Sequence, residues 1–285
     1  MYYENRVIAM LDVLGMANQL TNKESLIATT KKYSELIQEA QKNVLNQTTI
    51  PGSKVKDIEN FAFAEFVFDT IVLVSHPITV HSTAQFITGI SNLMGLFFKN
   101  KMPLRGSIGI GDYLVDKETN VFLSNIFKKL NNDELNQEWS GCCILPDAVD
   151  IILDNITGST VIDKDNQLQS NIFHLLNVPM KENKNENRLC INWYYSLIEQ
   201  ETKLGLEYMI GNKIKYDNTK EYIQQIKLLK DEYQILDETF LPATRLRVMK
   251  TRANVRIIFT DDNDIPVEPN LNDKTIEIYK KTNNG

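Results

Sequence analysis

The spacing of hydrophobic positions changes several times along the chain, and each change marks an expected element. Short runs of apolar and β-branched residues predict strands, at 6–13, 61–68, 71–75, 104–110 and, as a short partner, 113–115. Apolar residues at helical spacing predict helices at 23–45 and 80–99. This order is typical of an α+β, ferredoxin-like plan, in which helices cover one face of a mostly antiparallel sheet.

The second half of the chain has a weaker pattern. It predicts a helix at 145–154, a strand at 159–163 and a polar loop at 181–187. A mainly helical stretch follows at 192–237, and the segment at 246–259 has a strand-like end. We therefore expect one domain over residues 1–260, with a core at 5–165 and a mainly helical extension at 187–260. Residues 261–285 are expected to form an exposed tail.

Composition narrows the possible classes of protein. The 285 residues are 42% hydrophobic, enough for a core that needs no disulfides, and the three cysteines lack the spacing of a structural zinc site. The formal net charge of −6 argues against a nucleic-acid partner. No signal peptide or membrane-length apolar run is present, so we expect a cytoplasmic protein without a membrane partner.

Two aspartates interrupt apolar runs. Asp12 follows the strand-like RVIAML, and Asp69 stands in EFVFDTIVLVS, where two expected strands meet in a tight turn. A buried carboxylate is costly unless a cation or a proton compensates it. If the first strand pairs with the strand after the turn, the two acids converge. An alternative for Asp12 alone is a turn residue at a strand end before Gly15.

Two carboxylates without a nearby histidine or cysteine form an all-oxygen site, which favours Mg²⁺ or Mn²⁺ over zinc. Magnesium usually keeps water and substrate phosphates among its ligands. The pair therefore points to a nucleoside triphosphate as substrate.

Three segments in this order carry a family resemblance: MLDVLGM, FDTIVLVS and PLRGSIGIGD. Together they resemble the class III nucleotidyl cyclase domain, most of all the pyrimidine cyclases of bacterial Pycsar antiphage defence, over residues 5–165. The resemblance implies conversion of UTP or CTP to the 3′,5′-cyclic monophosphate and pyrophosphate. It also implies two metal ions per site and a head-to-tail homodimer.

The resemblance assigns roles to particular positions. Asp12 and Asp69 match the metal ligands, and the backbone of Val13, Leu14 and Gly15 would contact metal and triphosphate. Arg105 matches the strand arginine that binds phosphates in related cyclases, because a planar guanidinium suits that geometry. Its alternative is a surface charge at a strand end.

At two positions where purine cyclases carry a base-recognising residue, this chain carries a glutamate. Glu65 occupies the place of a base-recognising lysine, four residues before Asp69, and Glu138 precedes Gly141 by three residues as the base-recognising aspartate does. Two acceptors suit the uracil N3–H or the cytosine amine, with a lean to UTP. Glu138 could instead be an exposed acid of a helix or turn.

The resemblance also breaks down at two places. Leu145 and Val149 stand where class III enzymes carry an asparagine and an arginine that act in the transition state. Arg105, or Lys250 and Arg252 in the basic group at 245–256, could supply the missing charge, although that basic group could also be a solvated helix face. The alternatives are a catalytically impaired nucleotide-binding regulator and, from another class, a palm-like polymerase or cyclic-dinucleotide synthase.

Overall fold

The computed structural model describes residues 1–16, 20, 22–45, 59–116, 118–119, 121–157, 174–194, 197–239, 245–251 and 254–260. Within these ranges the chain has an α+β architecture, with a mixed but mostly antiparallel sheet and six α-helices. It divides into two compact units, Met1–Lys220 and Glu221–Gly285.

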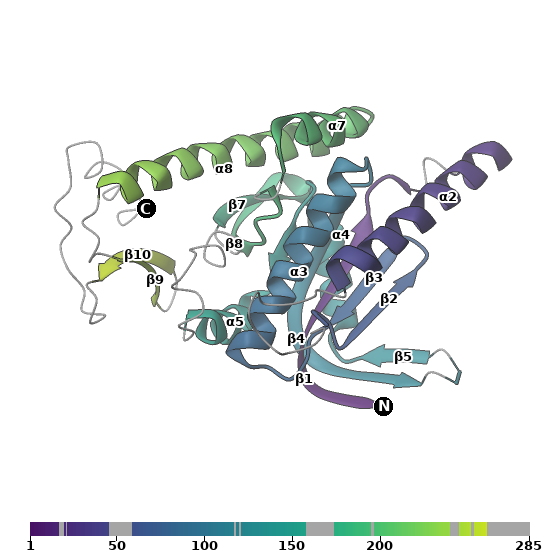
Figure 1. Ribbon diagram of the computed structural model, residues 1–285, viewed down its shortest axis with the longest axis horizontal. Coiled ribbons are helices and arrows are strands. Elements are labelled where there is room, and N and C mark those ends of the chain that lie inside the picture. The colour runs from purple at the N-terminus through teal and green to yellow at the C-terminus, as the bar shows by residue number, and fades with distance from the viewer. Residues whose placement is uncertain are drawn as a thin grey trace. The chain divides into compact units, whose positions relative to one another are not determined.

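The first unit begins with alternating strands and helices (Figure 1). Its elements up to the fourth strand are β1 Tyr2–Val13, α2 Lys23–Ala40, a π-helical turn Gln41–Leu45, β2 Phe63–Val67, β3 Thr70–Val74, α3 Val80–Lys99 and β4 Leu104–Asp116. The elements that follow are β5 Val121–Ser124, α4 Phe127–Asn136, β6 Cys142–Ile144, α5 Pro146–Thr157, β7 His174–Met180, a 3₁₀ turn Lys181–Asn183, β8 Lys184–Cys190 and α7 Glu199–Met209. Helix α8, Lys213–Thr239, begins in this unit.

The large sheet has the strand order β2-β3-β1-β4-β6-β8-β7, and β5 pairs with β4. The strands β2, β3, β1 and β4 pair with one another antiparallel, whereas β6 runs parallel to β4. The chain order strand, helix, strand, strand, helix, strand therefore places β1 between β3 and β4. This arrangement brings the end of β1 next to the β2–β3 turn and the start of β4.

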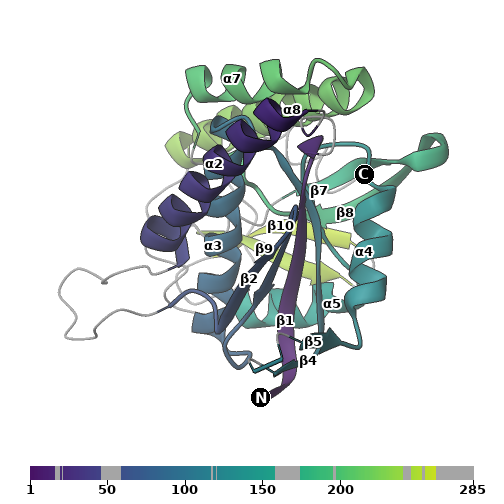
Figure 2. The ribbon, with the colours of Figure 1, turned by 90° about the vertical axis from the view of Figure 1, so that its right-hand side faces the viewer.

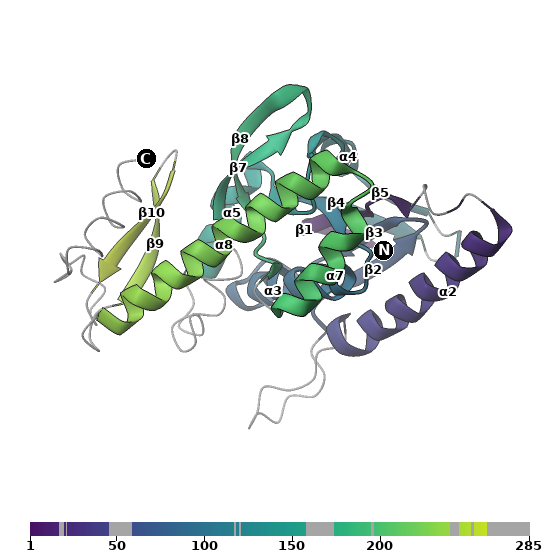
Figure 3. The ribbon, with the colours of Figure 1, turned by 90° about the horizontal axis from the view of Figure 1, so that it is seen from above.

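Strand β1 lies at the centre of the core. Val7, Ile8, Ala9 and Leu11 are fully buried, so both faces of the strand are covered. Figures 2 and 3 show α2 and α3 on one side of β1 and α4 on the other. The expectation of helices on one face is therefore wrong for α4. Glycines in β4 make this packing possible, since a Cβ at Gly109 would lie 2.6 Å from Ile126 Cδ1.

The sequence did not predict a helix on the second face of the sheet, because the segment that forms α4 is mostly polar. Its sequence FKKLNNDELN contains few apolar residues, of which Leu130 is fully buried. Helix α3, with a strong apolar stripe and the capping pair Thr79 and Ser82, has the expected bounds of 80–99.

Two local expectations need correction. The expected strand at 104–110 and its partner at 113–115 are one continuous strand, β4. The expected polar loop at 181–187 is a tight turn followed by β8, whose first four residues are exposed and so lack an apolar pattern. The expectation of a mainly helical stretch at 192–237 is confirmed by α7, which begins at Glu199, and by α8. The expected strand at 159–163 lies outside the described residues.

The second unit contains the rest of α8 and a two-stranded antiparallel sheet, β9 Arg245–Thr251 and β10 Asn254–Thr260. The basic group at 245–256 therefore lies on a hairpin and is not a helix face. Arg252 and the expected tail at 261–285 lie outside the described residues, as does the side chain of Lys250. In the ranges described above, no helix is long and apolar enough to span a bilayer.

Candidate functional site

Asp12 lies near the end of β1, between two antiparallel neighbours. It is paired with Thr70 on β3 and with Arg105 on β4. Directly paired residues of antiparallel strands project from the same face of the sheet. Asp12 and Arg105 therefore share a face, although they come from strands far apart in the chain.

Asp69 reaches the same place through the β2–β3 hairpin. The hairpin turn consists of Phe68 and Asp69, since Val67 and Thr70 are the last paired residues. The backbone N–H of Val13 donates to the carbonyl oxygen of Asp69 at 2.9 Å. This bond fixes the turn against the end of β1, and it brings the two aspartates of the sequence analysis together.

The charges at this end of the sheet are not balanced. Asp12 is half-buried, and its pKa is raised to about 7 by burial first and then by the negative charges of Glu134 and Asp69, while Arg105 and Lys215 act to lower it. Burial likewise raises the pKa of Tyr33, on α2, and Asp69 and Asp12 add to the effect. Three carboxylates thus crowd one site, where a cation would relieve their repulsion.

Arg105 is held in place by other protein groups. Its side chain is buried, its Nε and Nη2 both donate to Glu134 Oε1, and its Nη1 donates to the carbonyl oxygen of Gln137 at 2.8 Å. Burial raises the pKa of Glu134, while Arg105 acts to lower it. The guanidinium is therefore already neutralised by a buried carboxylate. Its charge is near Asp12, but most of its donors are in use.

The first turns of α8 lie over the segment that follows α4. Asn218 Nδ2 donates to the carbonyl oxygen of Glu138 at 2.7 Å, and the Ser140 N–H donates to Thr219 Oγ1 at 2.8 Å. Ser140 Oγ in turn donates to the carbonyl oxygen of Leu104, at the start of β4. These bonds connect α8 to the strand that carries Arg105.

The donors present at this site suit a magnesium or manganese ion. Asp12 and Asp69 offer carboxylate oxygens, and two carboxylates with water and phosphate as the other ligands are typical of Mg²⁺. In the part of the chain that the structure describes, no group of three or more His, Cys, Asp and Glu residues forms a metal cluster. A site of two carboxylates would fit the raised pKa of Asp12.

Gly15 lies just beyond the end of β1, in the turn at 14–15. Its φ of 76° lies in the left-handed region, which glycine adopts without strain. The residue is exposed, and the nearest atom to a hypothetical Cβ is Tyr208 Oη at 4.0 Å. The backbone at Gly15 is therefore open to a ligand, whereas the N–H groups of Val13 and Leu14 are bonded to Asp69 and Pro103 and cannot contact the triphosphate as expected. The preceding Leu14 N–H donates to the carbonyl oxygen of Pro103, and the side chains of Val13 and Leu14 are buried.

The two acids expected to recognise the base, Glu65 and Glu138, act on different neighbours in the structure. Glu65 is half-buried on β2, and its charge contributes, after burial, to the raised pKa of Tyr113 on β4. Glu138 is half-buried behind α4, and its charge acts on Lys215. Glu138 thus belongs to the neighbourhood of Asp12 and Arg105, whereas Glu65 lies near a different part of β4.

The two unusual apolar positions are structural. Leu145 is 2% exposed, and its N–H donates to the carbonyl oxygen of Ile108 on β4. Val149 lies on α5 and is half-buried. Neither side chain can donate a hydrogen bond to a phosphate, so any transition-state charge must come from another residue.

Sequence reasoning missed Glu134 and Lys215, two residues whose charges act on Asp12. Glu134 lies in a segment with little periodic signal. Lys215 lies in a segment that the sequence assigned only as helix. The available clue was Leu130, a buried residue on a helical repeat. Asp133 stands three residues after it, and Glu134 follows Asp133. Nothing in the linear order pointed from Lys215 to Asp12.

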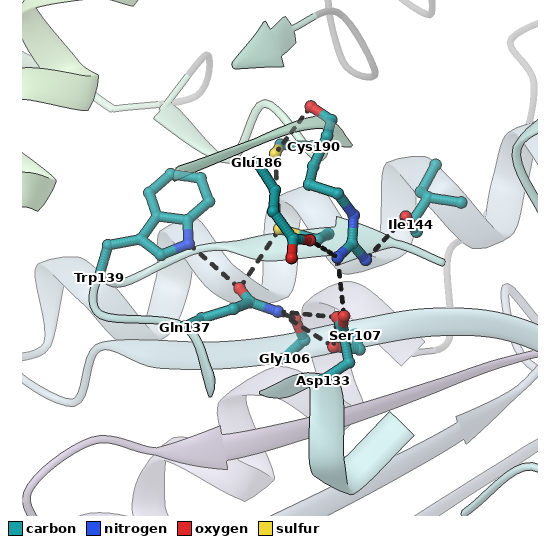
Figure 4. Close-up of polar contacts among 10 residues, drawn as sticks. Gly106, Ser107, Asp133, Gln137, Trp139, Ile144, Glu186 and Cys190 are labelled. Atoms are coloured by element: carbon teal, nitrogen blue, oxygen red, sulfur yellow. Dashed lines mark hydrogen bonds and ion pairs between the residues drawn. The ribbon is translucent and has the colours of Figure 1, made fainter. Parts of the chain in front are cut away.

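A second polar group lies on the same face of β4 (Figure 4). Gln137 Nε2 donates to the Gly106 carbonyl oxygen at 2.9 Å, Ser107 Oγ donates to Asp133 at 2.6 Å, and Trp139 Nε1 donates to Gln137 Oε1 at 3.1 Å. Arg188 Nη1 donates to Asp133 Oδ1 at 2.8 Å. These contacts hold α4, β4 and β8 together.

Comparison with known proteins adds no family assignment. No protein-family model matches the chain, and no curated protein matches it significantly.

Proposed function

We propose that the chain is a metal-dependent nucleotidyl cyclase that converts a pyrimidine nucleoside triphosphate, UTP or CTP, to the 3′,5′-cyclic monophosphate and pyrophosphate. The observation that carries the proposal is the meeting of Asp12 and Asp69 at one end of the sheet, with the pKa of Asp12 raised by burial and by neighbouring carboxylates. Such a perturbed acid in a polar site is a common sign of function.

The strand arrangement supports the same reading. The antiparallel order β2-β3-β1-β4, with α2 and α3 as connections, is the order of a ferredoxin-like sheet. It is also what the resemblance to class III cyclases implies. The further expectations of that resemblance, a head-to-tail homodimer and an antiphage second messenger, belong to this proposal. In such a dimer, Glu65 and Asp69 of one chain serve different sites.

The proposed reaction forms a bond between the ribose 3′-oxygen and the α-phosphorus and breaks the bond from that phosphorus to the pyrophosphate oxygen. The 3′-hydroxyl proton leaves to solvent. Divalent ions held by Asp12, Asp69 and the carbonyl of Val13 would lower the pKa of the hydroxyl and neutralise the leaving group. The exposed backbone at Gly15 allows the triphosphate to approach closely, and Glu138 accepts a hydrogen bond from the base.

A second candidate is a nucleotide-binding regulator that retains the site but not the catalysis. The buried Leu145 and the engagement of Arg105 by Glu134 favour it, because both remove groups that would stabilise transition-state charge. This candidate predicts nucleotide binding without a cyclic product.

One experiment separates the candidates. Purified protein is incubated with UTP, CTP, ATP or GTP and Mn²⁺, and products are identified by mass spectrometry. We expect a cyclic monophosphate from UTP or CTP, and a loss of at least a thousandfold in Asp12→Asn and Asp69→Asn. Asp147→Asn, an exposed acid on α5, is the matched control.

Binding without product in the unchanged protein would favour the regulator. A product that requires two nucleotides would instead indicate the polymerase or cyclic-dinucleotide class. Formation of cyclic product by both aspartate variants at the unchanged rate would contradict the assigned site.

A further inference from the structure

Lys215 lies in the first turns of α8, on the side of that helix that faces the candidate site. It precedes Asn218 and Thr219 by three and four residues, and residues at that spacing share a helix face. Asn218 and Thr219 bond to the backbone of Glu138 and Ser140. The same face therefore directs Lys215 toward the segment between α4 and β6, beside Arg105.

The electrostatic neighbours of Lys215 agree with this placement. Its positive charge lowers the pKa of both Asp12 and Glu134, and it is influenced in return by Arg105, Glu138, Glu134 and Lys181. The side chain is half-buried, and burial lowers its own pKa. Lys215 is therefore close to the acid site without being fully solvated.

Two of the other cations nearby are paired, and a third, Lys181, is exposed in the turn that follows β7. Arg105 is bound to Glu134, and Lys213, exposed at the start of α8, pairs with Asp217 at 2.7 Å. For Lys215, in contrast, no carboxylate among the described residues lies within salt-bridge distance of the ammonium group. Among the described residues, Lys215 is thus a half-buried cation acting on Asp12 and Glu134 whose three N–H donors are available to a ligand.

We infer that Lys215 binds the phosphate chain of the nucleoside triphosphate and supplies the positive charge that Leu145 and Val149 cannot. This inference rests on the proposed function for its substrate class, an organic triphosphate. It assigns a role to the α8 segment, which lies outside the part of the chain that resembles cyclases. Because an ammonium group acts as a point charge, we expect it to recognise phosphate and not the base.

Binding of inorganic triphosphate tests the assignment without any turnover. Isothermal titration in Mg²⁺ buffer compares inorganic triphosphate with uridine, for the unchanged protein, Lys215→Gln, Lys215→Arg and Lys220→Gln. A lost charge-assisted hydrogen bond should weaken triphosphate binding by about tenfold to a hundredfold in Lys215→Gln. Lys215→Arg should retain most of the affinity, because it keeps the charge.

The remaining variants and ligands separate a binding role from a structural one. Lys220 is exposed on the same helix, so Lys220→Gln should bind like the unchanged protein. Uridine affinity and the thermal unfolding midpoint should stay the same in Lys215→Gln. A Lys215→Gln protein that binds inorganic triphosphate as tightly as the unchanged protein, or loses uridine and triphosphate affinity equally, overturns the inference.

The inference and the proposed function can fail separately. If Lys215→Gln binds triphosphate normally while the unchanged protein makes a cyclic nucleotide, Lys215 is not the phosphate ligand but the cyclase proposal stands. If the unchanged protein makes no cyclic product and Lys215→Gln still loses triphosphate affinity, the phosphate site stands and the enzymatic proposal fails. If the unchanged protein binds no triphosphate, the inference is wrong.

Discussion

Two polar groups on the same face of β4 differ in how their charges are compensated. Around Asp133, the carboxylate receives hydrogen bonds from Arg188 and Ser107, and Gln137 is bonded at both ends of its amide. Around Asp12, the carboxylates of Asp69 and Glu134 add to the burial that raises its pKa to about 7. The first group, called the balanced group, pairs its buried guanidinium directly with Asp133 and Glu186. In the second, no cation among the described residues lies within salt-bridge distance of Asp12.

The difference is what we expect if the first group is structural and the second binds a ligand, as proposed above. A buried ion pair with additional hydrogen bonds holds elements together, and breaking it is costly because one charge is left without compensation. Carboxylates that repel one another reduce the stability of the fold unless a ligand compensates them, and such sites are common where proteins bind cations or substrates. The comparison therefore predicts opposite effects on stability when one acid is removed from each group.

The largest expected effect is on the balanced group. Asp133→Leu should lower the free energy of unfolding by about 2 to 3 kcal/mol, because the buried guanidinium of Arg188 then keeps only the more exposed Glu186 as a carboxylate partner. Urea denaturation measures the change. Lys129→Gln removes one partner of the exposed Lys129–Asp147 pair, and this control should cost less than about 1 kcal/mol.

A double variant shows whether charge is the cause. Asp133→Leu combined with Arg188→Met removes both charges, so it should recover most of the stability that Asp133→Leu loses. If the double variant is as unstable as the single one, the loss arises from packing, and the balanced group is not held by its ion pair.

The acid site should respond in the opposite direction. The pKa of Asp12 is about 7 in the folded protein and near 3.8 when the chain is unfolded, so the folded state binds more protons between these values. Its stability should therefore fall as pH rises from about 4 to 7. Asparagine does not ionise, and metal-free Asp12→Asn should be more stable than the unchanged protein above pH 7, by about 1 to 2 kcal/mol after solvent screening.

The pH profile of the difference is the measurement. Urea denaturation in EDTA at several pH values gives the stability of both proteins, and their difference should vanish near pH 4 and reach its full value near pH 8. Other titrating groups affect both proteins alike and cancel. A difference that does not depend on pH would show that Asp12 has an ordinary pKa, and the contrast between the two polar groups would then lose its basis.

How much of this could be predicted from the sequence depends on how strongly each segment is patterned. The continuous apolar run of β1 predicted a strand, and the apolar stripe of α3 predicted a helix. The tight turn at Asp69 was predicted because two expected strands adjoin there. The β7–β8 hairpin was missed because Lys184–Asn187 is polar and exposed. Strands are recognised in a sequence by their pattern of apolar residues, and this segment has none.

The site was predictable only in part for a similar reason. Asp12 and Asp69 are visible because each interrupts an apolar run. Glu134 stands in a polar helix, where an acid is unremarkable, and its pairing with Arg105 depends on α4 lying against β4. Lys215 depends on the hydrogen bonds that fix α8. Such tertiary pairings have no local signal in a single sequence.

The smallest expected effect tests the turn that positions Asp69. Phe68 is 88% exposed and has a φ of 56°, which costs a residue with a Cβ about 1 kcal/mol or more relative to glycine. Because little burial is lost, Phe68→Gly should raise the free energy of unfolding by about 0.5 to 1 kcal/mol. Phe66→Gly, at a half-buried paired position of β2, should instead destabilise the protein.

Product formation in Phe68→Gly then tells why a large apolar residue occupies a strained turn. If the turn only positions Asp69, the more stable variant should form product at the unchanged rate, since the Val13 to Asp69 backbone bond does not involve the Phe68 side chain. If stability rises but product formation falls, the exposed ring itself acts at the site, against the substrate or a second copy of the chain. A fall in stability would show that the ring makes a contact that compensates for its backbone strain.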